Sequence, residues 1–119
     1  MIINTTILKE KTVSINQFLP APKMQIEMNR INIMPEKVVN NVIQCEIKFS
    51  INIFDGDKKA LANLNLGYIV IATLEQDDKY EKDDCANRFF KVLQPMYIAE
   101  ANNLLRESPF PPIPMNIKC

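Results

Sequence analysis

The residue types that usually carry protein chemistry are few in this chain, and their spacing does not suit catalysis or metal binding. Histidine is absent, which removes the commonest general base, the Ser-His and Cys-His pairs and most zinc sites. Cys45, Cys85 and Cys119 are too widely spaced for a metal knuckle, and a reducing cytoplasm suits them best. The only two glycines cannot form a phosphate-binding loop. The sequence therefore predicts no enzyme activity, with no catalytic residues, no metal and no cofactor.

An acidic segment is the remaining candidate for a metal site. Its carboxylates are Glu75, Asp77, Asp78, Glu81, Asp83 and Asp84. They lack the spacing of a calcium loop, and lysines interrupt them, so a solvated loop that leads into a helix is the favoured interpretation. Asp83 or Asp84 is expected to cap that helix, because acidic side chains stabilise the positive end of a helix.

Length and charge limit the possible partners. The 119 residues suggest a single domain over 1–119, and a hydrophobic fraction of 47% is enough for a packed core. Lys plus Arg and Asp plus Glu both number 14, and this neutrality argues against a nucleic-acid partner. No apolar run approaches the ~20 residues of a membrane span. No signal peptide is visible at the N-terminus, so a cytoplasmic protein without a membrane partner is expected.

Two long segments in the middle of the chain predict a β-hairpin. In the first, apolar residues occupy every second position of 43–53, which is typical of an antiparallel strand with one buried face. The turn that follows contains Asp55-Gly56-Asp57, where Gly56 can take a positive φ at little cost. The return strand covers about 59–75, and Gly67 within it predicts a bulge or a close approach of backbone.

The return strand has a second apolar face after Gly67. Ile69 and Ile71 point away from the face that its other apolar residues share. A domain this small covers a sheet on one side only, so this second face predicts the interface of a homodimer or homotetramer. The alternative is a strand that lies between two layers of its own chain.

Weaker strand patterns precede the hairpin, and helices follow it. Residues 5–16 and 23–33 alternate, the first with Ile7, Val13 and Ile15 on one face, and the second with a change of face around Asn29-Arg30 that suggests a twist or bulge. A helical pattern over 89–93 is interrupted at Pro95, which fits the first turn of a second helix that continues to Leu105. The predicted fold is therefore α+β: a four-stranded antiparallel sheet, then a short and a long helix packed on one face.

The end of the chain is too apolar for a solvated linker and too rich in proline for a helix. It reads Phe110-Pro-Pro-Ile-Pro-Met115. Such a segment is expected to be ordered and to pack against the body of the domain as an extended strap.

This order of elements resembles the SecB family of export chaperones over most of the chain, from about Thr6 to Ile117. The residues that carry the resemblance are the first strand with its Pro20-Ala-Pro22 exit, the hairpin with its acidic glycine turn and Gly67, Gln94-Pro95 where the family has Phe-Pro, and the tail 110–115. The resemblance implies a β-β-β-β-α fold and a dimer of dimers. It also implies ATP-independent binding of non-native polypeptide, with protein export as one setting. The chain departs from the acidic classical members in being neutral, and from their aromatic before the proline.

Several functions are compatible with these features. The leading one is a SecB-like chaperone or adaptor that binds non-native or extended polypeptide. The second keeps the fold but serves a single partner, as a phage or mobile-element assembly protein or a chaperone of toxin–antitoxin type. The third is a hot-dog-type enzyme, which the absence of an acid/base pair disfavours. The predicted lining of a polypeptide groove is Phe89, Phe90, Met96, Tyr97 and Phe110, although core packing between helix and sheet is an alternative for the adjacent phenylalanines.

Overall fold

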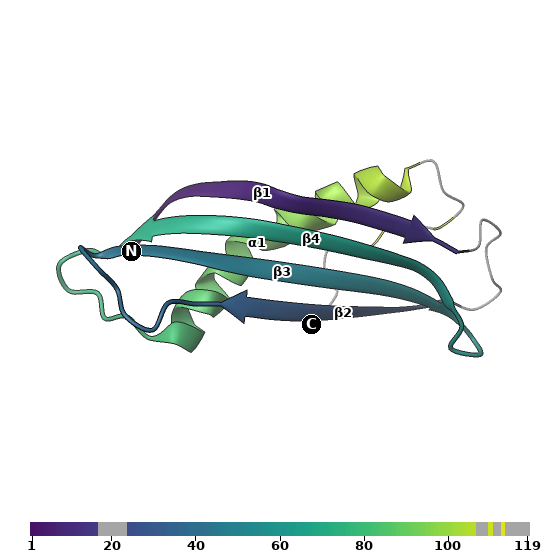
Figure 1. The fold of residues 1–119 in the computed structure, drawn as a ribbon, viewed down its shortest axis with the longest axis horizontal. Coiled ribbons are helices and arrows are strands. Elements are labelled where there is room, and N and C mark those ends of the chain that lie inside the picture. The colour runs from purple at the N-terminus through teal and green to yellow at the C-terminus, as the bar shows by residue number, and fades with distance from the viewer. Residues whose placement is uncertain (17–23, 107–109, 111–112, 114–119) are drawn as a thin grey trace.

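The fold is seen in a computed structural model that describes residues 1–16, 24–106, 110 and 113. Four strands precede one helix: β1 (Ile2–Ile15), β2 (Met24–Ile33), β3 (Val42–Asp55), β4 (Ala60–Thr73) and α1 (Lys82–Leu105). The strands form one antiparallel sheet in the order β1-β4-β3-β2. Figure 1 shows α1 crossing one face of this sheet obliquely, so that the helix starts near β2 and ends near β1. The predicted α+β fold, with four antiparallel strands and helix on one face, is confirmed.

The core lies between α1 and the two central strands. The covered face of β3 carries six buried residues at alternate positions: Ile43, Cys45, Ile47, Phe49, Ile51 and Ile53. Each pairs with a buried residue of β4, as Phe49 does with Leu66 and Ile47 with Tyr68. Alternation is the cause, because successive side chains of a strand point to opposite faces and only one face meets the helix.

The predicted break at Pro95 is wrong, because α1 continues through this residue as a single helix of 24 residues. Pro95 has no N–H and therefore cannot bond the carbonyl of Lys91. Packing on either side offsets this loss: Leu93 and Tyr97 are both buried against the sheet, whereas Pro95 is exposed. Tertiary contacts thus override a local helix-breaking signal.

Two local expectations were also wrong by a few residues. The N-cap is Glu81, whose carboxylate oxygens accept hydrogen bonds from the backbone N–H of Asp83 at 3.2 Å and of Asp84 at 2.6 Å. Both predicted capping residues therefore lie in the first turn, where their charge still suits the helix dipole. In the hairpin turn, Lys58 and not Gly56 has the positive φ, of 63°.

A bulge in β1 corrects the predicted faces of that strand. The pairing with β4 shifts between Leu8 and Glu10, so Ile7 faces the same side as Ile69 while Val13 pairs with Leu64 of the covered face. Glu10 folds over Gly67, where an added Cβ would lie 3.2 Å from the Glu10 Cβ, and the predicted close approach at Gly67 is confirmed. In β2 the expected bulge is absent, since its pairing with β3 is continuous throughout, but the apolar residues do change face: Met28 pairs with Ile51 of the covered face and Ile31 with Lys48 of the open face.

Candidate polypeptide-binding surfaces

Three of the five residues predicted to line a groove are buried in the core. Phe89 and Tyr97 are 0% exposed, and Phe110 is 6% exposed. The Tyr97 ring stacks on Phe49 of β3 with 4.1 Å between centroids. The space between helix and sheet is therefore filled at these residues, as expected for core packing. Only Phe90, which is half-buried, and Met96, which is 37% exposed, are accessible from outside.

Phe90 lies under an arginine from the edge strand β2. The Arg30 guanidinium carbon is 4.6 Å from the centroid of the Phe90 ring, a cation–π geometry. The same guanidinium donates a hydrogen bond to Asn87 Oδ1 at 3.1 Å. These contacts attach the first turns of α1 to the outer edge of the sheet.

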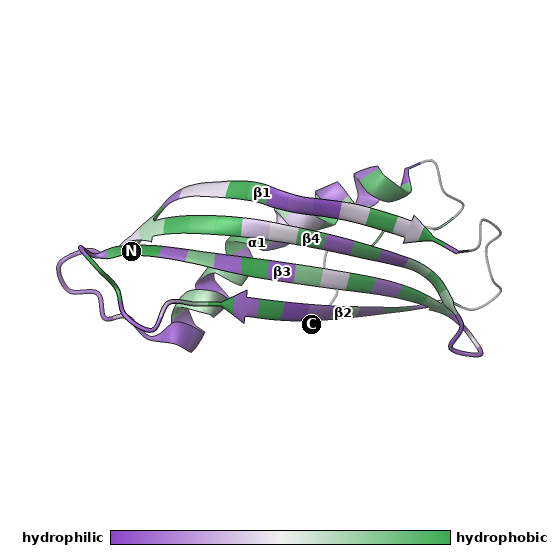
Figure 2. Cartoon of the chain, viewed as in Figure 1, coloured by the Kyte–Doolittle hydropathy of each residue, from purple (hydrophilic) through white to green (hydrophobic). Residues whose placement is uncertain are grey.

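Among the described residues no element covers the face of the sheet opposite α1, and one half of this open face carries exposed or half-buried isoleucines. Ile69 and Ile71 of β4 are half-buried there, beside Ile7 of β1. On the other side of β3, Ile31 and Ile33 of β2 are 58% and 50% exposed. The viewer of Figure 2 sees this open side, because α1 lies behind the sheet. The structure brings the predicted interface residues Ile69 and Ile71 together with Ile7, and we call these three the isoleucine patch. Ile31 and Ile33 lie apart from it, on the far side of Glu46 and Lys48 of β3.

The other half of the open face is polar and largely uncharged. The Asn65 side-chain amide donates to Asn63 Oδ1 at 2.6 Å, and the Asn63 amide donates to Asn52 Oδ1 at 2.6 Å. Between the two halves, Lys9 extends from the bulge across β4, and its Nζ lies 3.3 Å from a carboxylate oxygen of Glu46. Satisfied amides and paired charges make this half a solvated surface, in contrast to the isoleucine patch.

Both edges of the sheet are accessible. In the part of the chain that the structure describes, neither β1 nor β2 pairs with a further strand on its outer side. The β1 edge exposes apolar residues on both faces: Ile2, Ile7, Leu8 and Val13. An edge strand of this kind presents unpaired backbone donors and acceptors to another chain. A sheet edge lined with apolar side chains can bind an extended polypeptide as an additional strand.

An open cavity of about 480 Å³ lies next to the end of β2. Its walls are Asn32, Ile33, Met34, Glu36, Lys82, Asp83 and Ala86. Two contacts join the loop after β2 to the start of α1. Lys82 Nζ lies 2.6 Å from Glu36 Oε1, and the Tyr80 hydroxyl donates a hydrogen bond to the Pro35 carbonyl at 2.5 Å. A side chain of a polypeptide bound along β2 could enter this cavity.

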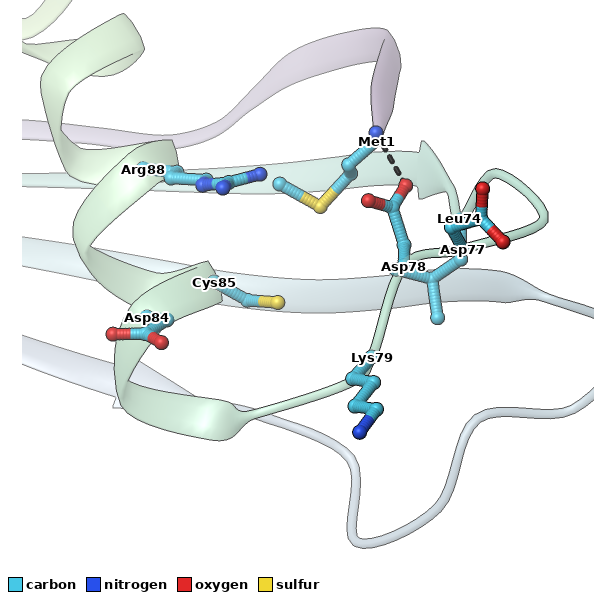
Figure 3. Close-up of a pocket in the computed structure, with 8 residues that line it drawn as sticks. All are labelled: Met1, Leu74, Asp77, Asp78, Lys79, Asp84, Cys85 and Arg88. Atoms are coloured by element: carbon cyan, nitrogen blue, oxygen red, sulfur yellow. Dashed lines mark ion pairs between the residues drawn. The ribbon is translucent and has the colours of Figure 1, made fainter.

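A smaller cavity, of about 220 Å³, lies at the acidic segment (Figure 3). The Met1 ammonium pairs with Asp78 at 2.5 Å, and this contact holds the pKa of the Asp78 carboxyl below its ordinary value. Cys85 and Arg88 approach the cavity from α1. Among the residues that the structure describes, no group of three or more Cys, Asp or Glu side chains is placed to hold a metal ion.

Two titratable groups of the core, Cys45 and Tyr68, are held neutral by burial. Burial raises the pKa of the Cys45 thiol to about 11 and that of the Tyr68 phenol to about 12. Both shifts disfavour the charged form at neutral pH, which is opposite to what a nucleophile or general base needs. Within the described residues no helix has the length and hydropathy of a membrane span.

The comparison with solved structures identifies the fold. A SecB-like chaperone from Mycobacterium tuberculosis, Rv1957, solved with a ChAD peptide from the Rv1956 HigA1 antitoxin, superposes with a TM-score of 0.71. The chain has a SecB-like fold. The match covers 98% of this chain and 89% of the other, at 16% sequence identity. No protein-family model matches the sequence, and comparison with curated protein sequences found no significant match. The resemblance to SecB inferred from the order of elements is therefore confirmed for the fold.

Sequence reasoning missed two features of these surfaces. The first is the exposed edge position of β2, because the alternation predicts the face of Ile31 and Ile33 but not that their strand lies at the edge of the sheet. The second is the bulge that moves Ile7 next to Ile69, for which the charged Lys9-Glu10-Lys11 stretch was the only available signal.

Proposed function

We propose that this SecB-like protein is a chaperone or adaptor that binds extended or non-native polypeptide without ATP, and that it is not an enzyme. The observation that carries the proposal is the open edge of β2 with its exposed apolar side chains, Ile31 and Ile33. Main-chain hydrogen bonds to such an edge give affinity for many sequences, while side-chain contacts give selectivity. The neutral core groups support a binding role over acid/base chemistry.

The edge of β2 is the proposed site for the bound polypeptide. It is adjacent to a cavity, and the start of α1 extends beside it, with Phe90 partly accessible below Arg30. Of the predicted groove residues, Phe90 is the one that lies accessible at this edge, whereas the exposed Met96 contacts Thr6 of β1 at the opposite edge of the sheet. Tyr97 and Phe49 support the Phe90 ring from within, whereas Phe110 lies beside Leu105 at the other end of α1.

The edge of β1 and the isoleucine patch are the proposed sites of self-association into a homodimer or homotetramer. β1 has 14 residues with apolar side chains on both faces, so a second copy could extend the sheet there. Ile69 and Ile71 lie directly beside it. Cys45 and Cys85 are free and buried, which agrees with a reducing compartment such as the cytoplasm.

A single-partner role is the second candidate, and one observation favours it. The structurally similar Mycobacterium tuberculosis protein was solved with a peptide from an antitoxin, so this fold can accommodate a defined peptide. The two roles differ in selectivity: a general chaperone delays many unrelated clients, whereas a dedicated one acts on one partner only. The chain lacks the acidic net charge of the classical SecB members, so the proposal does not require export.

The test is suppression of client aggregation in the absence of nucleotide. The wild-type protein should slow the aggregation of several unrelated unfolded clients. Ile31→Lys with Ile33→Lys should abolish most of this effect, because two charges would replace the apolar side chains of the edge. Glu27→Lys with Asn29→Lys is the matched control, on the same strand and face, and should retain activity. If the Ile31/Ile33 variant suppresses aggregation as well as the Glu27/Asn29 control does, β2 is excluded as the site. If the wild-type protein suppresses the aggregation of no client, a general chaperone role is excluded.

A further inference from the structure

The side chain of Asn102 holds the backbone of Ile113 as a neighbouring strand would. Its Oδ1 accepts a hydrogen bond from the Ile113 N–H at 2.7 Å, and its Nδ2 donates to the Ile113 carbonyl at 3.3 Å. The two bonds use both backbone groups of one residue. They fix the position of that residue along α1 without reading its side chain.

The prolines around Ile113 leave Asn102 only one backbone N–H in this stretch to bind. Prolines at 111, 112 and 114 have no N–H, so Ile113 is the only backbone donor between 111 and 114. That donor is the one that Asn102 binds. A proline-rich segment cannot add to a sheet edge through a regular ladder, and an amide side chain supplies the pairing that it cannot obtain from a strand.

Two apolar side chains of the same segment are buried. Ile113 is 2% exposed and Phe110 is 6% exposed, and both belong to the core that includes Leu105. Phe110 and Ile113, an aromatic and an aliphatic residue three positions apart, are thus held by burial of their side chains, and Ile113 also by one backbone clamp. These are the usual elements of an extended-peptide site: anchor pockets for side chains and hydrogen bonds for backbone.

An open pocket lies beside the aromatic end of this site among the described residues. A cavity of about 330 Å³ adjoins Phe110, with Asn102, Leu105 and Arg106 among its walls. A larger aromatic side chain, or a further residue of a bound peptide, could occupy this space. The site is therefore not shaped solely around the residue that fills it.

We infer that Asn102 and the pockets of Phe110 and Ile113 form a peptide-binding site that the chain's own residues occupy, and that a client segment with an aromatic residue three positions before an aliphatic one competes for it. This inference rests on the proposed function, since it names a class of segment that the chaperone would bind. The native occupant has a high effective concentration because it is part of the same chain. Free peptide therefore binds weakly until that occupant leaves.

The experiment measures binding of a fluorescent peptide, Ser-Pro-Phe-Pro-Pro-Ile-Pro-Met, to the full chain. Phe110→Ser with Ile113→Ser removes both native anchors and should raise the affinity for the peptide at least tenfold over the wild type. Adding Asn102→Ala to that variant should lower the affinity again at least fivefold, whereas adding Asn103→Ala, the neighbouring residue on α1, should not. A vacated variant that binds no more tightly than the wild type would overturn the inference.

A second measurement needs no core substitution. In the wild type, saturating peptide should speed hydrogen exchange of the Ile113 amide at least tenfold, because its bond to Asn102 is lost when the segment leaves. Unchanged exchange with peptide bound would place the peptide elsewhere and overturn the inference. Failure of the proposed function gives a different result. If the Phe110→Ser/Ile113→Ser variant binds the peptide but neither it nor the wild type slows client aggregation, the peptide site is supported and the chaperone role is excluded.

Discussion

The two faces of the sheet differ in burial and composition, although the same alternating strands form both. On β3, the residues that face α1 are apolar and at most 3% exposed, from Ile43 to Ile53. The residues between them face the open side and include Gln44, Glu46 and Lys48. The covered face determines the fold, because burial of its side chains drives the packing of α1. The open face is free of that constraint, and its composition reflects contacts with solvent or with another chain.

The open face is itself divided, and the division is informative. Its amide half satisfies its own hydrogen bonds through Asn52, Asn63 and Asn65. Its isoleucine patch has no covering layer in the described part of the chain. Exposed isoleucines scattered singly need no explanation, but a contiguous group on adjacent strands indicates an interaction surface.

The largest expected effect is on the covered face. Phe49→Ala should reduce the free energy of unfolding by about 3–5 kcal/mol, because Phe49 is fully buried and its ring contacts Tyr68, Phe90 and Tyr97. Ser50→Ala, the next residue on the open face, is the control and should change it by less than about 0.5 kcal/mol. Urea unfolding at a fixed protein concentration measures both. Similar losses for the two variants would show that the faces do not differ in this way.

The isoleucine patch should affect assembly more than it affects folding of the protomer. Ile71→Asp should dissociate the homo-oligomer, since an unpaired charge in a buried interface costs several kcal/mol. Asn29→Asp, in the polar half of the open face, should leave the assembly unchanged. Light scattering at micromolar concentration reports the mass of each. A wild-type protein that is strictly monomeric would contradict the proposed interface.

Removal of the C-terminal strap should have an intermediate effect on stability. Deleting the residues after Ser108 removes Phe110 and Ile113 from their pockets. Burial of each of these side chains contributes about 1.5–3 kcal/mol to the free energy of unfolding. The entropy of ordering the strap opposes this gain, so a net loss of about 2 kcal/mol is expected. Thermal unfolding should show a lower melting temperature. An unchanged value would mean that the covered face does not need the strap.

The smallest effect concerns the reactivity of a thiol on the covered face. Because burial raises the pKa of Cys45 to about 11, its thiolate is scarce in the folded protein at pH 8. A soluble thiol reagent should therefore label Cys45 only as fast as the protein unfolds. As pH rises from the ordinary thiol range towards 11, the unfolded chain loses this proton while the folded one retains it, so stability should fall. Labelling of Cys45 at the rate of a free thiol would indicate that the core opens readily.

The sequence allowed the strands and the covered face to be predicted, because alternation over 43–53 is a strong and local signal. The continuity of α1 could not be predicted, since Pro95 signals a break locally and only the contacts of Leu93 and Tyr97 with the sheet overcome it. The strap was predicted to dock: Phe110 and Ile113 are buried as expected, whereas Met115 and the loop 18–22 lie outside the described residues. The Asn102 clamp depends on a tertiary contact, for which a single asparagine in a helix gives no signal.

The predicted groove illustrates a second limit of sequence reasoning. Aromatic residues at helical spacing are required both for a core and for a binding groove, so Phe89 and Phe90 alone do not distinguish them. The structure places Phe89 inside and Phe90 at the rim beside Arg30. Whether the rim binds polypeptide remains a prediction, and Phe90→Ser should weaken client binding if the fold survives.

The most direct test of the chaperone role is the refolding rate of a slow-folding client, followed without nucleotide at increasing concentrations of this protein. The proposed function predicts a delay that grows in proportion to oligomer concentration and that occurs with several unrelated clients, because the exposed edges bind backbone and apolar side chains in general. If refolding of every client proceeds at its unassisted rate, general chaperoning is wrong and the single-partner role takes its place.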